Sequence, residues 1–120
     1  MRLQEIPPDL RATLSLVLGQ RKRYAEIAAM LGIEERAVHD RAHAALALLA
    51  PRQARALSAA EREQVGEYML GQADDSRQSA TVAYLGGSPA ARAWAQALAA
   101  ELGPLAVASG LPAIPTAESI

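Results

Sequence analysis

The chain has 120 residues, enough for one small domain or two very small ones. It contains 28 alanines and 16 leucines but few β-branched residues, a composition that favours helices and argues against an all-β fold. It has no cysteine, which excludes disulfides, cysteine-ligated zinc and thiol catalysis, and its net charge of −1 does not by itself indicate a polyanionic partner.

The small net charge conceals two halves of opposite sign. Residues 1–57 carry nine Arg and Lys against six Asp and Glu, giving +3, whereas residues 58–120 carry three against seven, giving −4. This asymmetry predicts two roles, or one half that shields the other. The sequence has no uncharged apolar run of 18 residues and no signal-peptide pattern. We therefore expect a cytoplasmic protein, or the cytoplasmic part of a membrane-tethered one.

The first half predicts three helices, at residues 9–18, 24–31 and 34–49. Gly19 and Gly32 follow the first two, as is common at helix carboxyl ends. In the third, apolar residues recur at helical spacing, so one narrow arc is expected to face the core. This arc contains Val38, Ala42, Ala45 and Leu49.

The second half begins with a predicted hinge at residues 51–57 and continues with three more helices. Ser58 and Glu61 have the spacing of a capping box, which starts a helix near residue 59. Gly71 is expected to end that helix, with Val65 and Met69 on its inner face.

The last two helices are predicted from their amino-terminal caps. Acidic and serine residues at 74–76 start one helix, with Val82 facing inward, and Ser88 followed by Pro89 starts the other. The expected fold is all-α, with these parts: a helix-turn-helix three-helix module at residues 1–50, a hinge at 51–57, a second small three-helix module at 58–108 and a flexible tail at 109–120.

Residues 24–49 carry the strongest functional signal. A short helix, a glycine turn and a longer crossing helix form a helix-turn-helix, and DNA-binding versions place the front of the second helix in the major groove. The residues expected on this recognition front are Arg36, His39, Asp40, Arg41 and His43. The residues expected to contact phosphates are Arg21, Lys22, Arg23 and Tyr24.

Three motifs give this region a family resemblance. They are Ile6-Pro-Pro-Asp-Leu-Arg11, Tyr24-Ala-Glu-Ile-Ala-Ala-Met-Leu-Gly-Ile33 and, after Val38, Arg41-Ala-His43. Residues 5–50 resemble region four of bacterial RNA polymerase sigma factors, of the extracytoplasmic-function type. The resemblance implies a helix-turn-helix that grips the upstream element of a promoter.

The sequence departs from that family on the recognition front. The family has Lys or Arg where this chain has His39, a small polar residue at the place of Asp40 and another Arg at the place of Ala44. Residues 34–49 sum to a charge of −1, although phosphate neutralisation supplies most non-specific DNA affinity. Two interpretations stay open: direct DNA binding, or a protein-interaction module that has lost its DNA contacts.

The second half has a resemblance of its own. The segments Glu67-Tyr-Met-Leu-Gly71, Asp74-Asp75 and Ser88-Pro-Ala-Ala-Arg92 resemble the helical anti-sigma domain that binds and masks sigma factors. Many members hold zinc through a His-x3-Cys-x2-Cys site, but this chain has Tyr84, Ser88 and Ala91 there. The resemblance therefore implies a domain without that zinc site. A plain helical appendage is the alternative.

Some residues have both a structural and a functional interpretation. If their apolar side chains are exposed, four residues are expected to bind a protein partner: Tyr68, Met69, Trp94 and Leu98. If these side chains are buried, Trp94 is expected to anchor the small core. His39 and His43 are spaced i,i+4, which can suit a metal ion. Because surface histidines on a helix more often face solvent, no metal site is expected.

The sequence as a whole predicts a transcription regulator that is not an enzyme and needs no cofactor or small-molecule substrate. The alternative is an anti-sigma-type module that binds a sigma factor or RNA polymerase without touching DNA. The expected partners are promoter DNA, a sigma factor or RNA polymerase, and a second copy of the chain, since Ala-rich helices pack closely.

Overall fold

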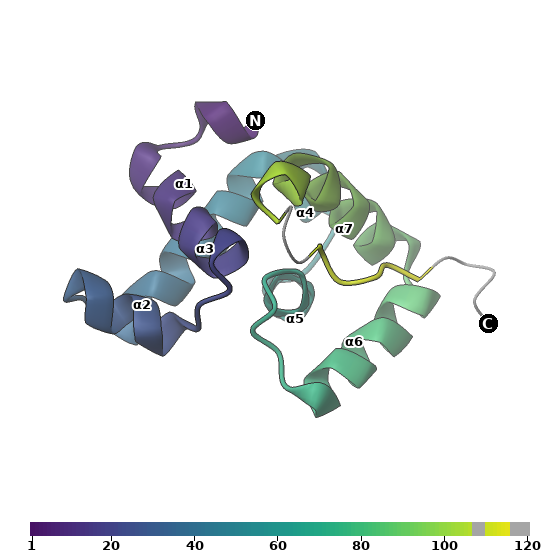
Figure 1. The fold of residues 1–120 in the computed structure, drawn as a ribbon. Helices are drawn as coiled ribbons and strands as arrows, with labels where there is room; N and C mark the ends of the chain where they lie inside the picture. The colour runs from purple at the N-terminus through teal and green to yellow at the C-terminus, as the bar shows by residue number, and fades with distance from the viewer. Residues whose placement is uncertain (107–109, 116–120) are drawn as a thin grey trace.

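The computed structural model describes residues 1–106 and 110–115, and within these ranges it contains helices and no strand. The expected all-α fold is confirmed (Figure 1). In chain order the elements are η1 (Leu3–Glu5), α1 (Pro8–Leu14), η2 (Ser15–Gly19), α2 (Tyr24–Leu31), α3 (Glu35–Leu49), α4 (Pro51–Ala54), α5 (Ala59–Met69), α6 (Asp75–Gly87), α7 (Pro89–Leu102) and η3 (Gly103–Leu105).

The helix-turn-helix predicted around Gly32 is present. Gly32 adopts φ 67° and ψ 34°, the left-handed conformation that glycine tolerates best, and it ends α2 so that the chain can turn into α3. Both α1 and α2 pack on α3, whose predicted apolar arc is buried from Val38 to Leu49. This three-helix arrangement leaves the opposite side of α3 available for other contacts.

Several predicted boundaries differ from the structure. The first helix is divided into α1 and a π-helical turn, η2, and part of the predicted hinge forms the short helix α4. The inward placement of Val82 is wrong, because this side chain is 41% exposed. The buried positions of α6 are instead Thr81 and Leu85, and the Thr81 hydroxyl donates a hydrogen bond to the carbonyl of Arg77 at 2.8 Å.

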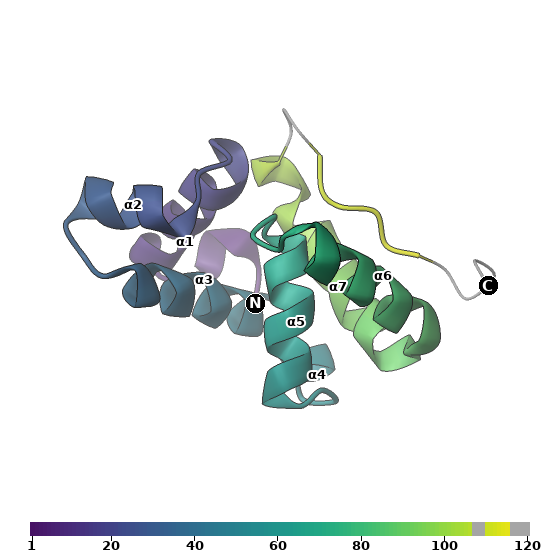
Figure 2. The same ribbon diagram turned by 90° about the horizontal axis from the view of Figure 1, so that it is seen from below.

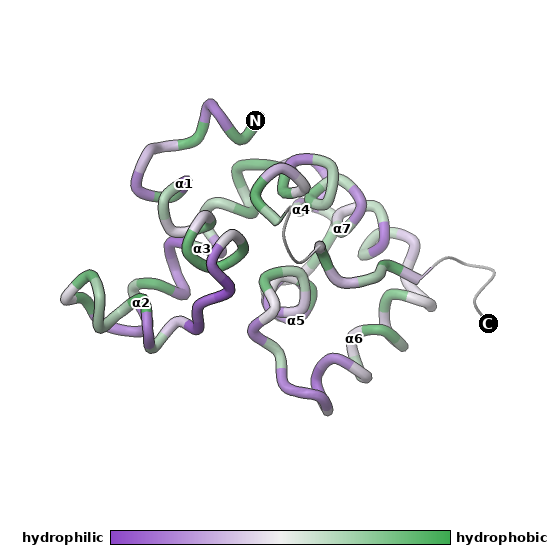
Figure 3. Tube along the Cα trace, in the orientation of Figure 1, coloured by the Kyte–Doolittle hydropathy of each residue, from purple (hydrophilic) through white to green (hydrophobic). Residues whose placement is uncertain are grey.

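One cluster of buried apolar residues extends through both halves of the chain. It includes Leu14 and Leu46 from the first half and Trp94 and Leu98 from α7, which packs against α3, α4, α5 and α6. Hydrophobic and hydrophilic residues are interspersed along the chain, as expected for amphipathic helices (Figure 3). The core is therefore continuous across residues 51–57, where the sequence predicts a hinge between two modules.

Helix α5 connects the second half to the helix-turn-helix. It runs across α3, and the chain then turns at Gly71, with φ 72°, into the segment that leads to α6 (Figures 1 and 2). Among the described residues, no helix combines the length and apolar character needed to cross a membrane. The position of α5 thus decides how much of the surface of α3 is open.

The capping box that starts α5 gives a first prediction. Ser58 Oγ accepts a hydrogen bond from the Glu61 backbone N–H at 3.1 Å, and the Glu61 carboxylate accepts one from the Ser58 N–H at 2.7 Å. We expect Ser58→Ala to lower the free energy of unfolding by about 1 kcal/mol, because it leaves a helix-end donor without its partner. Urea denaturation followed by circular dichroism measures this loss. The exposed Ser79→Ala, within α6, is the matched control and should cost nothing.

Candidate nucleic-acid interface

The exposed part of the recognition front lies near the amino-terminal end of α3. The side chains of Arg36 and Asp40 are 80% and 59% exposed, and Arg36 Nε lies 3.3 Å from Asp40 Oδ1. Arg41 is half-buried. The guanidinium of Arg36 is therefore available to a ligand, although the neighbouring carboxylate offsets part of its charge.

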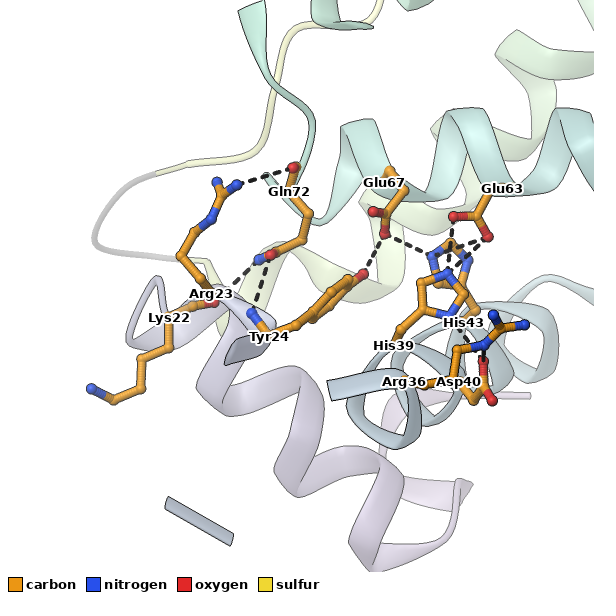
Figure 4. Close-up of polar contacts among 10 residues, drawn as sticks. All are labelled: Lys22, Arg23, Tyr24, Arg36, His39, Asp40, His43, Glu63, Glu67 and Gln72. Atoms are coloured by element: carbon orange, nitrogen blue, oxygen red, sulfur yellow. Dashed lines mark hydrogen bonds and ion pairs between the residues drawn. The ribbon is translucent and has the colours of Figure 1, made fainter. Parts of the chain in front are cut away.

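His39 and His43, the two histidines of the recognition front, point toward α5 and not toward solvent (Figure 4). His39 Nε2 lies 2.9 Å from both carboxylate oxygens of Glu63, and His43 Nε2 lies 2.9 Å from Oε2 of Glu67. The imidazole rings also lie against each other, with centroids 4.3 Å apart. Two acidic residues of the second half thus cover two of the five residues of the predicted recognition front.

The acidic surroundings change the titration of these groups. Burial by itself lowers the pKa of His39, but hydrogen bonds to Asp40 and Glu63 and the charges of Glu63 and Glu67 outweigh it, so the pKa is raised. Burial by itself raises the pKa of Glu67, but hydrogen bonds from His43 and Tyr24 outweigh it, so the pKa is lowered. Both shifts favour the charged forms, which strengthens the contact between α3 and α5.

Tyr24 also belongs to this contact. Its ring is buried and its hydroxyl donates a hydrogen bond to the Glu67 carboxylate. Burial, followed by the hydrogen bond to Glu67 and its charge, raises the pKa of Tyr24, so the phenol stays protonated and acts as a donor. Tyr24 is therefore held inside the protein, where its hydroxyl is not free to meet a phosphate.

The segment after α5 engages the basic cluster before α2. Gln72 accepts a hydrogen bond from the Tyr24 N–H at 3.3 Å and donates one to the carbonyl of Lys22 at 3.1 Å. The guanidinium of Arg23 donates to the carbonyl of Gln72 at 3.4 Å. Arg21 is exposed and has a positive φ of 54°, which is uncommon for a residue other than glycine. Arg23 is also exposed and Lys22 is half-buried, so the basic cluster keeps cations at the surface although Gln72 holds its backbone.

The four residues suggested as partner contacts lie in the interior. Tyr68 is 6% exposed, Met69 and Leu98 are 0% exposed and Trp94 is 1% exposed. The Tyr68 hydroxyl donates to the carbonyl of Ala113 at 2.5 Å. These side chains are therefore part of the core, as the sequence predicts for Trp94 in the case that it is buried.

Glu63, Glu67 and Gln72 contact the predicted site residues, although none of the three is among the residues predicted from the sequence. The signal that was available is spacing, because Glu63 and Glu67 repeat on α5 the i,i+4 interval of His39 and His43 on α3. Gly66 is a further residue of this contact that was not predicted. A Cβ built at Gly66 would lie 2.7 Å from Cε1 of His43, so the absence of a side chain there lets α5 approach α3 closely.

In the comparison with known proteins, one family model matches the amino-terminal part of the chain. Residues 1–49 match the family described as Sigma-70, region 4. No curated protein and no solved structure matches the chain. The match supports a sigma region-four-like helix-turn-helix, a type of domain that binds DNA in transcription and has no enzymatic role. It ends nine residues before Ser58 and so covers the recognition helix but not α5.

Proposed function

We propose that this chain is a transcription regulator whose region-four-like helix-turn-helix binds promoter DNA, and that its own α5 masks the recognition front. The observation that carries the proposal is the pairing of Glu63 and Glu67 with His39 and His43 across the front of α3. In this arrangement the acidic half of the chain shields the basic half. DNA binding then requires α5 to move away from α3.

Electrostatics supports a masking role for α5. DNA affinity depends largely on cations that neutralise phosphates, and a carboxylate facing a phosphate opposes binding. Glu63, whose side chain is 49% exposed, lies beside the histidines on the side that DNA would approach. Exposed Arg36, Arg21 and Arg23 are among the cations that remain available to DNA in the masked form. The masked form should therefore bind DNA weakly.

The test is a pair of charge-neutralising variants of the full chain. Glu63→Gln with Glu67→Gln weakens the hold of α5 and should raise the affinity for random-sequence duplex at least about tenfold, with binding that falls steeply as salt increases. Fluorescence anisotropy with labelled duplex measures both quantities. The control is Asp9→Asn with Asp75→Asn, which changes the net charge equally at two exposed positions away from the contact.

The outcomes separate the two parts of the proposal. Equal affinity gains in both double variants would show a simple charge effect and contradict masking. An absence of DNA binding by the Glu63 and Glu67 variant at low salt would contradict DNA binding itself. A further change, Arg36→Ala in the unmasked variant, should reduce affinity and make the salt dependence shallower, because it removes one cation from the front.

A second candidate is an anti-sigma-type module that binds a sigma factor or RNA polymerase without contacting DNA. One observation favours it: Glu34 and Glu35, where α3 begins, are both exposed, so the open end of the recognition helix is acidic. An acidic end suits a basic protein surface better than a phosphate backbone. Co-purification with a sigma factor or core polymerase that survives Arg36→Ala would support this candidate.

A further inference from the structure

The histidine and glutamate pairs on α3 and α5 form a cluster with the composition of a metal site. We propose that His39, His43, Glu63 and Glu67 together bind a divalent transition-metal ion such as Zn²⁺. Each helix supplies two ligands at i,i+4 spacing, which places both on one face of that helix. Imidazole nitrogens and carboxylate oxygens are established ligands of zinc, so the donor set suits this ion.

The distances within the cluster suit a four-coordinate ion. One ligand atom from each of the four residues lies within 4.8 Å of the other three. A tetrahedral site with bonds of about 2.0–2.2 Å separates its ligand atoms by about 3.4 Å. The separations of Glu63 Oε1 from Nε2 of His39 and of His43, 2.9 and 3.9 Å, lie on either side of that value. Small side-chain movements therefore suffice to bring the four atoms around an ion.

The contacts of His39 show why a cation belongs at this place. Nδ1 of His39 lies 2.9 Å from the Asp40 carboxylate, which can accept a hydrogen bond only from a protonated Nδ1. The neutral ring then presents a lone pair at Nε2, where both oxygens of Glu63 lie 2.9 Å away. Acceptors at this distance repel unless a positive charge lies between them. Either a second proton or a metal ion supplies that charge.

Residues outside the four ligands already orient them as a metal site requires. The contact from Asp40 to His39 fixes the ring with Nε2 toward the cluster, and the Tyr24 hydroxyl holds the Glu67 carboxylate. Gly66 allows the His43 ring to lie directly against α5. Side-chain exposures of 20% for His39 and 16% for His43 leave the ligands partly desolvated but still accessible to an entering ion.

Charge balance also favours a divalent ion. Two neutral imidazoles and two carboxylates carry a charge of −2, which one Zn²⁺ neutralises. Burial penalises an unbalanced charge, so neutralisation stabilises the contact between α3 and α5. Its consequence for DNA rests on the proposed function: a bound ion would tie α5 to the recognition helix and keep the front closed.

Cobalt binding by the tag-free full chain tests the site directly. The protein is stripped with EDTA, exchanged into buffer at pH 8 and titrated with Co²⁺, and then Zn²⁺ is added. We expect visible absorption bands of four-coordinate cobalt that saturate at one equivalent and disappear as Zn²⁺ displaces Co²⁺. His39 and His43 are the only histidines and the chain has no cysteine, so an imidazole-ligated signal arises from this pair alone.

Variants distinguish the four-ligand site from a histidine pair alone. Glu63→Gln removes a half-exposed ligand and should abolish the saturable cobalt spectrum, while Asp40→Asn should weaken Zn²⁺ binding by about 10–100-fold. The control Asp75→Asn should bind like the unmodified chain. Circular dichroism establishes that each variant folds. In addition, Zn²⁺ should raise the melting temperature of the unmodified chain but not that of Glu63→Gln.

Two results would overturn the proposal. One is an unmodified chain that shows neither a saturable cobalt spectrum nor a zinc-dependent rise in melting temperature. The other is a Glu63→Gln variant that binds Co²⁺ as tightly as the unmodified chain, because the glutamates are then not ligands. Neither result affects the DNA-binding proposal when the anisotropy measurements are made on metal-free protein with EDTA in the buffer.

Discussion

Replacing Trp94 with alanine is expected to lower the free energy of unfolding by about 3–5 kcal/mol. Trp94 is 1% exposed and belongs to the cluster that joins the two halves of the chain. The substitution removes the largest buried side chain and leaves a cavity that Ala-rich neighbours cannot fill. Urea denaturation followed by far-ultraviolet circular dichroism measures the loss, since the variant lacks the only tryptophan.

Trp94→Phe is the matched control. The indole Nε1 is buried and has no hydrogen-bond partner within residues 1–106 and 110–115, so this change removes an unsatisfied donor while keeping an aromatic ring. We expect it to cost about half as much as the alanine substitution or less. A loss below about 1 kcal/mol for Trp94→Ala would contradict a central place for this side chain in the core.

Gly66→Ala is expected to lower the free energy of unfolding by about 1–2 kcal/mol, although alanine is the better helix former. The added Cβ would lie 2.7 Å from Cε1 and 2.9 Å from Nδ1 of His43, and 3.2 Å from Cδ1 of Leu46. The imidazole has to swing away, which breaks its contact with Glu67. The same variant should therefore bind duplex DNA more tightly and Zn²⁺ more weakly than the unmodified chain.

Gly86→Ala is the control for this prediction. Gly86 lies inside α6, and a Cβ there meets no atom within 4 Å. The substitution should raise the free energy of unfolding by about 0.5–1 kcal/mol through helix propensity, without changing DNA or zinc binding. Thermal and urea denaturation of the two variants in parallel give the comparison. Equal effects from both would contradict a close approach of α5 to α3 at Gly66.

The helices could be predicted because their signals are local. Ser58 with Glu61, Ser88 with Pro89, and the turn at Gly32 each act over three or four residues, and the structure shows the helix ends that they predict. The buried arc of α3 was predictable for the same reason, since a period of 3.6 residues sorts apolar side chains onto one face. Val82 was misplaced because α6 contains few large apolar residues, and such a weak apolar pattern does not determine which side of the helix faces the core.

The amino-acid sequence by itself determined the all-α fold, the helix-turn-helix and the opposite charges of the two halves, because helix propensity, end caps and composition act within short stretches. Only the tertiary structure decided that α5 lies across α3. That arrangement joins Glu63 and Glu67 to histidines 24 positions earlier in the chain. It depends on how the shared core fills around Trp94 and on the close approach allowed at Gly66, and neither leaves a periodic signal along the chain.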